Sequence, residues 1–254
     1  MLPIPAEELN GSGALGPYWT FYHAVVAEQL GRWLPQSPST VLDMSGGNGR
    51  WAAQAAKAGH RVVEVVDFRR PADVQPLHDI SKVSQVRADD LHFLPDGSVD
   101  AVMAEERALS VDLMAESAIG DVARVLRPGG RALVCVDSLV LGMAILAEQN
   151  YWAHLRQTGE VMLVPWPDGS ITRCFSSVQL RELLTDAGLE VEWIRPRTVL
   201  SPSTVDHVLA SDSRALTWLV NTELDTHPED DDTVGIHLVA SAKKPVHGDA
   251  GASR

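Results

Sequence analysis

The sequence has few cysteines and no grouping of metal ligands. Its 254 residues include two cysteines, Cys135 and Cys174, which are too few for the disulfide framework of a small secreted protein. No cysteine or histidine cluster has the spacing of a metal site. We therefore expect two free thiols, no bound metal and a cytoplasmic location.

Long apolar runs and an excess of positive charge are missing as well. No stretch is apolar over the roughly 20 residues that a membrane span needs, and residues 1–10 lack the basic and apolar regions of a secretory signal. The net charge is −13. Because nucleic-acid binders need a basic face, this charge leads us to expect no nucleic-acid partner. The absence of a long apolar run leads us to expect no membrane partner. The length suits one large α/β domain.

The segment TVLDMSGGNG, residues 40–49, combines a strand with a glycine-rich turn. Its first three residues have the β-branched or apolar character of a buried strand, and Asp43 follows at the carboxyl end. Residues 50–58 are alanine-rich and predict a helix that Gly59 ends. A strand, a glycine turn and a helix in this order place backbone amides against a bound ligand.

Asp43 limits the kind of ligand that this turn can hold. The glycines do not follow the G-x-G-x-x-G spacing of dinucleotide sites, and a carboxylate directly before the turn would repel a pyrophosphate. A ligand with an ammonium group and no phosphate suits Asp43 better. These features point to S-adenosylmethionine, which carries an amine and a cationic sulfur.

The segment resembles the first motif of class I S-adenosylmethionine-dependent methyltransferases, in which an acid precedes glycines at alternate positions. It matches at Asp43, Gly47 and Gly49 and departs at Ser45, where the family usually has glycine. The strings LPDGSVDAV and RVLRPGGRALV strengthen the resemblance. It implies a Rossmann-like α/β fold with a doubly wound, seven-stranded, mostly parallel sheet. The implied cofactor is S-adenosyl-L-methionine, with S-adenosyl-L-homocysteine as product.

Acidic residues follow four successive predicted strands. Asp43, Asp67, Asp89 and Glu105 come after strands 40–42, 61–66, 83–88 and 99–104. Because the carboxyl ends of parallel strands meet at one edge of a sheet, we expect these acids to line one crevice. Such a row of acceptors suits a ligand with an amine, a diol, an exocyclic amine and a sulfonium.

The resemblance implies a role for most of these residues. In the family, the acid after the second strand binds the ribose hydroxyls, which implies Asp67, with Phe68 against the adenine. The acid after the third strand binds the adenine amino group, which implies Asp89 or its neighbour Asp90, with Leu91 beside the ring. The expected cofactor contacts are Asp43, Ser45, Gly46, Gly47, Gly49, Asp67, Phe68, Asp89, Asp90, Leu91 and Glu105.

We expect a single domain over residues 1–254. Its core comprises residues 34–137, 177–195 and 234–245, and its helical and hairpin cap elements comprise residues 18–33, 138–176 and 196–233. The cap carries aromatic residues. We expect it to form a roof that covers the methyl donor and encloses a pocket for a small organic acceptor. The alternative is that these rings fill a satellite core. The substrate-binding candidates are Trp19, Tyr22, Arg107, Tyr151, Trp152 and Trp166.

Methyl transfer is an in-line displacement, so the enzyme must align nucleophile, methyl group and sulfur and exclude water. An oxygen or nitrogen nucleophile can also require a general base. The candidates for this catalytic role are His23, Glu106 and His154. His237, in the last predicted strand, is interpreted as a core or surface histidine.

The favoured interpretation is a methyltransferase for a small organic acceptor, such as a secondary metabolite, that is methylated at oxygen, nitrogen or carbon. Three other functions stay open. The same fold can use the bound sulfonium for a pericyclic or cyclisation step, or the chain can be an NAD(P)-dependent oxidoreductase, which Asp43 opposes, or a binding module without turnover. The sequence leaves the acceptor and the oligomeric state open, and a homodimer is compatible with it.

Overall fold

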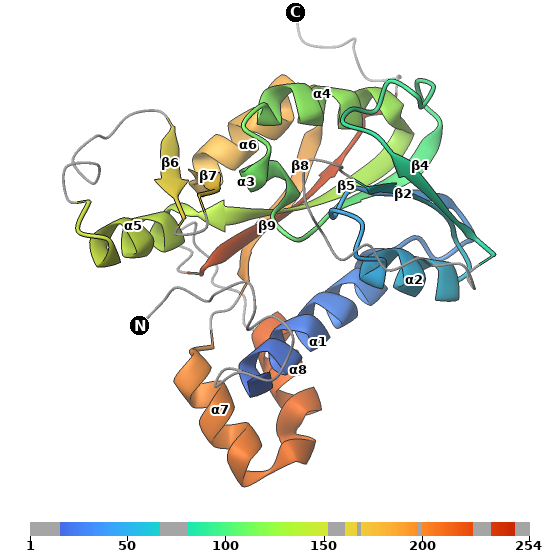
Figure 1. The fold of residues 1–254 in the computed structure, drawn as a ribbon. Coiled ribbons are helices and arrows are strands. Elements are labelled where there is room, and N and C mark those ends of the chain that lie inside the picture. The colour runs from blue at the N-terminus through green and yellow to red at the C-terminus, as the bar shows by residue number, and fades with distance from the viewer. Residues whose placement is uncertain are drawn as a thin grey trace, which may run out of the picture.

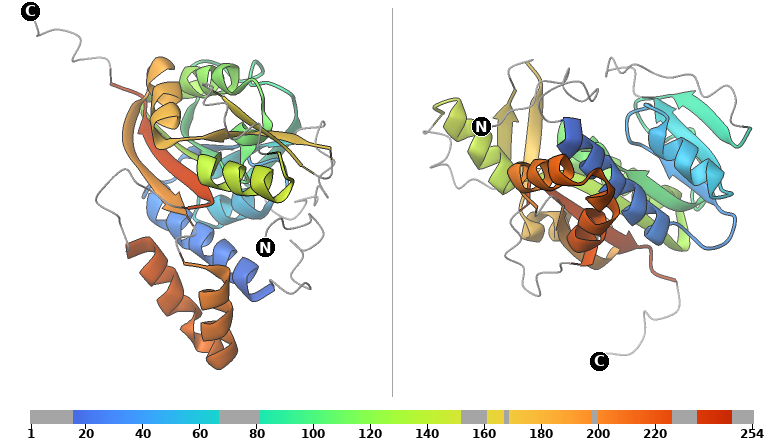
Figure 2. Two further views of the ribbon diagram at one scale, coloured as in Figure 1. Left: turned by 90° about the vertical axis from the view of Figure 1, so that its left-hand side faces the viewer. Right: turned by 90° about the horizontal axis from the view of Figure 1, so that it is seen from below.

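The computed structural model describes residues 16–66, 81–151, 161–166, 169–197, 200–225 and 235–246. In this part of the chain, one twisted β-sheet has helices on both of its faces (Figure 1, Figure 2). The strands are β1 (Thr40–Asp43), β2 (Arg61–Val66), β3 (Val83–Arg87), β4 (Val99–Ala104), β5 (Leu126–Ser138), β6 (Met162–Pro165), β7 (Ile171–Phe175), β8 (Glu190–Arg197) and β9 (His237–Lys243). The helices are α1 (Gly16–Trp33), α2 (Arg50–Lys57), α3 (Ala108–Val111), α4 (Ala115–Val125), α5 (Leu139–Glu148), α6 (Ser177–Asp186), α7 (Pro202–Ser211), the 3-10 helix η3 (Ser213–Ala215) and α8 (Leu216–Asp225).

The sheet has nine strands in the described part of the chain, and its centre follows the order β3-β2-β1-β4-β5. These five strands are parallel, and β9 then pairs antiparallel with both β5 and β8. The predicted doubly wound, mostly parallel sheet is therefore confirmed. The two strands beyond the predicted seven, β6 and β7, form the hairpin expected in the cap, and β7 runs alongside the carboxyl end of β5.

Alternate residues of the central strands pack with opposite helical layers. Val41, Met103 and Leu133 belong to the core cluster that includes α1 and α2, whereas Leu42 and Val134 belong to the cluster that includes α4 and α6. Because these strands are covered on both sides, their sequences are almost continuously apolar. Polar residues gather instead at the carboxyl ends of the strands, which is the edge where a ligand would bind.

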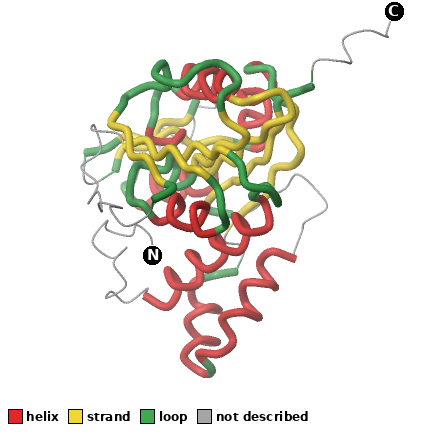
Figure 3. Tube along the Cα trace, turned by 90° about the vertical axis from the view of Figure 1, so that its right-hand side faces the viewer, coloured by secondary structure: helices red, strands yellow, loops and turns green. Residues whose placement is uncertain are grey.

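Helix α1 lies between the sheet and a separate pair of helices, α7 and α8 (Figure 3). On the sheet side, Trp33 is buried in the same cluster as β1 and α2. On the other side, Tyr18 and Phe21 pack with Val205 of α7 and Leu219 of α8. This double contact explains why α1 carries aromatic residues on more than one face. Within the described ranges, no helix is long and apolar enough to cross a membrane.

The apolar residues between positions 139 and 157 predict one cap helix, and the helix in the structure is shorter. Helix α5 ends at Glu148, and Asn150 adopts a left-handed backbone conformation with a φ of 60°. The amide of Tyr151 then donates to the carbonyl of Leu146 at 2.9 Å, which closes the helix end. Apolar residues resume at Tyr151, so the pattern alone predicted a longer helix. Residues 152–160, with the candidates Trp152 and His154, lie outside the described part of the chain.

Candidate functional site

The glycine-rich turn after β1 has the backbone that its sequence predicts. Gly46, Gly47 and Gly49 have φ angles of 97°, 87° and 74°, in the left-handed region that favours glycine. At Gly47, a Cβ atom would lie 2.9 Å from Cγ2 and 3.1 Å from Cα of Val66. The closest neighbour of this position is therefore strand β2, and the packing of the protein itself requires glycine there.

Buried carboxylates hold both ends of this turn. Asp43 accepts a hydrogen bond at Oδ1 from the amide of Ser45, at 2.9 Å. Glu64, on β2, accepts one at Oε1 from the amide of Gly49, at 2.7 Å, and a second at Oε2 from Gln85. Both acids are almost fully buried. Glu64 was not among the residues predicted from the sequence, although a single acid within the apolar run RVVEVV could have indicated it.

Asp43 is poised to respond to a nearby positive charge. Its burial raises the pKa of its carboxyl group to about 7, while the hydrogen bonds from Ser45 oppose that shift and the neighbouring Glu64 and Glu105 add to it. A cation placed beside this carboxyl group would favour its charged form. Ser45 also explains the departure from glycine in the motif, because its Oγ accepts a hydrogen bond from the amide of Glu105 at 3.1 Å and so ties the turn to the end of β4.

Glu105 forms a buried ion pair with Arg197. The Nη1 atom of Arg197 lies 2.7 Å from Oε2 of Glu105, and its Nη2 atom lies 2.9 Å from Oε1. The same guanidinium donates to Oε1 of Gln29 on α1, at 2.6 Å and 3.1 Å. The pair therefore joins β4, β8 and α1. Both oxygens of Glu105 are engaged by Arg197, and a contact between Glu105 and a cofactor stays a prediction.

The turn and the end of β3 share one cavity of about 450 Å³. Gly46 contributes from the turn, and Asp89, Asp90 and Leu91 contribute from the segment after β3. Asp90 also accepts a hydrogen bond from the amide of His92 at 2.9 Å. The fold thus brings two predicted segments together that are more than 40 residues apart in the sequence. Asp67 and Phe68, predicted for the same site, lie outside the described residues.

The segment after β4 is strained. Glu106 and Arg107 are consecutive non-glycine residues with φ angles of 53° and 60°, a conformation that typically persists at functional sites because the surroundings enforce it. Glu106 accepts a hydrogen bond from Nε1 of Trp51 at 3.0 Å, and burial raises the pKa of its carboxyl group. The guanidinium of Arg107 lies 5.2 Å from the ring centre of Trp166.

The predicted base His23 lies on α1 between indole rings. Its ring centre is 6.2 Å from that of Trp19 and 6.3 Å from that of Trp51. Burial lowers the pKa of His23 to about 4, and the positive charge of Arg50 adds to the shift. His23 is therefore neutral at physiological pH, as a proton acceptor must be, but it is a weak base.

A chain of three polar side chains at the same edge was missed by sequence reasoning. The hydroxyl of Tyr22 lies 3.3 Å from Nδ1 of His237, and Nε2 of His237 lies 3.5 Å from Oδ1 of Asp137. Arg107 approaches the other oxygen of Asp137, also at 3.5 Å. Asp137 and His237 face each other across the β5–β9 pair, 100 positions apart in the sequence, so only the strand pairing reveals the contact.

The aromatic candidates do not form one roof. Trp19 and Tyr22 are buried in the core cluster between α1 and the sheet, and their role in substrate binding stays a prediction. Trp166 lies on the hairpin beside Arg107, whereas Tyr151 is exposed just beyond the end of α5. Trp218, in the cap element 196–233, is 62% exposed on α8. The structure therefore groups Tyr22, Arg107 and Trp166 around the carboxyl ends of β4 and β5.

Comparison with known proteins adds a family to this geometry. A family model described as "Methyltransferase domain" matches residues 18–193. An uncharacterized methyltransferase of Mycobacterium tuberculosis is 29% identical over 216 residues, which cover 82% of this chain and 79% of the relative. Three proteins of that kind match.

Solved structures with the same fold include two enzymes with different activities. One is 1,6-didemethyltoxoflavin-N1-methyltransferase of Burkholderia thailandensis, solved with 1,6-didemethyltoxoflavin and S-adenosylhomocysteine; it is 18% identical, with a TM-score of 0.56 and coverage of 96% of this chain and 92% of that one. The other is the 4+2 cyclase SpnF, at 19% identity and a TM-score of 0.58, with coverage of 93% and 84%. At these identities the likeness concerns the fold alone.

We predict that Gly47→Ala destabilises the protein more than Gly59→Ala. Both glycines have positive φ angles, so both variants lose about 1–2 kcal/mol from backbone strain. Only at position 47 does the new methyl group meet strand β2, which adds about 1–3 kcal/mol of overpacking. Urea unfolding of both variants measures the difference. Equal losses would contradict the close approach of Val66.

We also predict that Arg197→Met costs about 3–5 kcal/mol at pH 8, because it leaves the buried Glu105 without its counter-charge. Arg127→Met, which breaks the exposed pair with Asp100, serves as control and costs about 1 kcal/mol or less. Urea unfolding of both variants tests this, and a loss that matches the control contradicts it.

Proposed function

The chain belongs to the methyltransferase-domain family, the class I S-adenosylmethionine-dependent methyltransferases, and on this premise we propose that it methylates a small organic acceptor. The family model spans residues 18–193 and so includes the glycine turn, the strained segment after β4 and the end of β5. S-adenosyl-L-methionine is the cofactor. The observation that carries the proposal is the cavity shared by the glycine turn and the segment after β3.

The residues in and beside that cavity fit the cofactor chemically. We assign the buried Asp43, whose carboxyl group has a pKa of about 7 and which directly precedes the cavity residue Met44, to the ammonium of the methionine end. Asp89 or Asp90, with Leu91, is assigned to the adenine, and Asp67 and Phe68 keep their proposed contacts with the ribose and the ring. Gly46, Gly47 and Gly49 give the turn its left-handed backbone, and Gly46 lines the cavity. The remaining predicted contacts, Ser45 and Glu105, are assigned to positioning the turn.

On the acceptor side, we propose that Arg107, Trp166 and Tyr22 orient the substrate at the ends of β4 and β5. The bound cofactor supplies an electrophilic methyl group. The protein excludes water and aligns the acceptor atom, which are the main requirements of an in-line displacement. Trp19, Tyr151 and Trp152 stay candidates for the same pocket. The grouping of a cation with an indole ring suits an acceptor with a planar, electron-rich body.

A nucleophile that carries a proton needs a base. Beside the base candidates predicted from the sequence, the structure contains one further group of side chains that could serve. Tyr22, His237 and Asp137 form a path in which the tyrosine hydroxyl can pass a proton to Nδ1 of His237 while Asp137 faces Nε2. Burial lowers the pKa of His237 well below its ordinary value, so the ring is neutral but, like His23, a weak base. His23, Glu106 and His154 remain the alternatives.

The other functions are less favoured. The similarity to SpnF concerns the fold, whereas the family model and the curated relatives are methyltransferases. An NAD(P)-dependent oxidoreductase would need a turn that tolerates a pyrophosphate, and the buried Asp43 and Glu64 beside this turn repel one.

Transfer of a labelled methyl group tests the proposal directly. We expect that the protein, incubated with methyl-labelled S-adenosylmethionine and a panel of phenols, amines and carboxylic acids, forms S-adenosylhomocysteine together with one labelled product. Asp89→Ala should weaken cofactor binding by about tenfold or more, since a charge-assisted hydrogen bond is lost, and should slow labelling at low cofactor concentration. Conversion of an acceptor without label in any product would contradict methyl transfer and favour the cyclisation alternative.

A further inference from the structure

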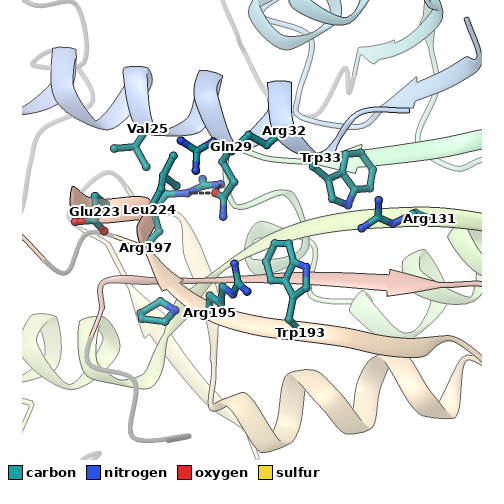
Figure 4. Close-up of a pocket in the computed structure, with 11 residues that line it drawn as sticks. Val25, Gln29, Arg32, Trp33, Arg131, Trp193, Arg195, Arg197, Glu223 and Leu224 are labelled. Atoms are coloured by element: carbon teal, nitrogen blue, oxygen red, sulfur yellow. Dashed lines mark hydrogen bonds between the residues drawn. The ribbon is translucent and has the colours of Figure 1, made fainter. Parts of the chain in front are cut away.

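A second hollow, of about 210 Å³, lies between α1, β8 and α8, on the face of the sheet that α1 covers (Figure 4). It shares no lining residue with the 450 Å³ cavity beside the glycine turn. The residues that line it are Val25, Gln29, Arg32, Trp33, Arg131, Trp193, Arg195, Pro196, Arg197, Glu223 and Leu224. Nothing in the proposed methyl transfer uses this hollow.

The lining is cationic in a strongly acidic protein. Four of the residues around the hollow are arginines and one is a glutamate, although the whole chain has a net charge of −13. The glutamate, Glu223, accepts a hydrogen bond from the amide of Leu200 at 3.0 Å. Arginine side chains gathered on one wall can attract a small anion where their own acidic partners are absent or exchangeable.

Three of the four arginines have acidic partners that stand outside the lining. Arg197 is neutralised by Glu105, with both residues buried. Arg32 pairs with Glu28 at 2.9 Å, and Arg131 pairs with Glu192 at 2.7 Å. The last two pairs are partly exposed, and exposed pairs contribute little, so their guanidinium groups can turn to a stronger partner at small cost.

Arg195, the fourth arginine of the lining, takes part in none of these three ion pairs. In the described ranges it forms no ion pair, and its guanidinium lies 4.9 Å from the ring centre of Trp193. Arg131 is placed similarly, 5.5 Å from the ring centre of Trp33. Figure 4 shows both guanidinium–indole pairs on the wall of the same hollow. A planar guanidinium is well suited to a carboxylate or a phosphate, because its fork of donors matches two oxygens at once.

We infer that this hollow binds a small organic anion: an aromatic body that carries one carboxylate or phosphate group. The oxyanion would lie against Arg195, with Arg131 as the second cation. The body would rest on the apolar wall formed by Trp33, Trp193 and Pro196. The volume equals that of about seven water molecules, which limits the ligand to roughly one ring.

Calorimetric titration of the intact protein tests the inference. The probes are benzoate, phenyl phosphate, inorganic phosphate and the neutral benzyl alcohol. We expect saturable binding of benzoate or phenyl phosphate that weakens with added salt, and no measurable binding of benzyl alcohol. The stronger of the two aromatic anions identifies the head group. Inorganic phosphate is expected to bind more weakly than phenyl phosphate, because it lacks the body.

Arg195→Gln removes the arginine of the hollow that has no ion pair among the described residues, and it is expected to weaken binding of the aromatic anion by about tenfold or more. The control Arg214→Gln removes one positive charge from the exposed pair with Asp212 and should leave the affinity unchanged. Circular dichroism verifies that both variants are folded. Absence of saturable binding up to 10 mM (about the limit of a useful affinity), equal affinity for benzyl alcohol, or equal weakening by both substitutions would overturn the inference. None of these outcomes bears on methyl transfer, which is measured separately.

Discussion

The burial of acidic side chains beside the glycine turn is the constraint on which the rest of the site depends. Asp43 and Glu64 accept hydrogen bonds from amides at the two ends of the turn, and Glu105 forms an ion pair with Arg197. Charged groups in such a place are costly unless they are paired or hydrogen-bonded. Glu64 and Glu105 have their partners within the protein. Asp43 receives hydrogen bonds from Ser45 and has no counter-charge within the described part of the chain, so a cationic ligand would complete the cluster.

The sequence was sufficient for the fold because its signals are local. Apolar runs that end in an acid, a glycine turn and a Pro-Gly-Gly string each predict one strand or one junction, and parallel sheets bring the carboxyl ends together without further information. The cavity that joins Gly46 to Asp89, Asp90 and Leu91 followed from this rule. What the sequence could not reveal are partners set by strand pairing and helix docking. Arg197, which engages Glu105, and His237, which faces Asp137, come from the last strands and have no local pattern.

Helix α1 connects the parts of the molecule that function would use. It buries Trp33 against the sheet, carries Tyr22 to His237, holds Arg197 through Gln29 and packs on α7 and α8. The aromatic character that suggested a roof over the cofactor also serves this packing. Arg197 belongs both to the pair with Glu105 and to the wall of the arginine-rich hollow, so one guanidinium connects the end of β4 with that hollow.

The most direct test of the central claim is the number of protons released when S-adenosylmethionine binds. At pH 6 the Asp43 carboxyl group, with its pKa near 7, is about nine-tenths protonated. Contact with the ammonium group of the ligand would favour the charged form and expel that proton. Calorimetry at pH 6 in two buffers of different ionisation enthalpy should therefore give binding enthalpies that differ by an amount corresponding to nearly one proton, and Asp43→Asn should abolish the difference. Equal enthalpies in both buffers for the unaltered protein would contradict the claim that the cation lies against Asp43.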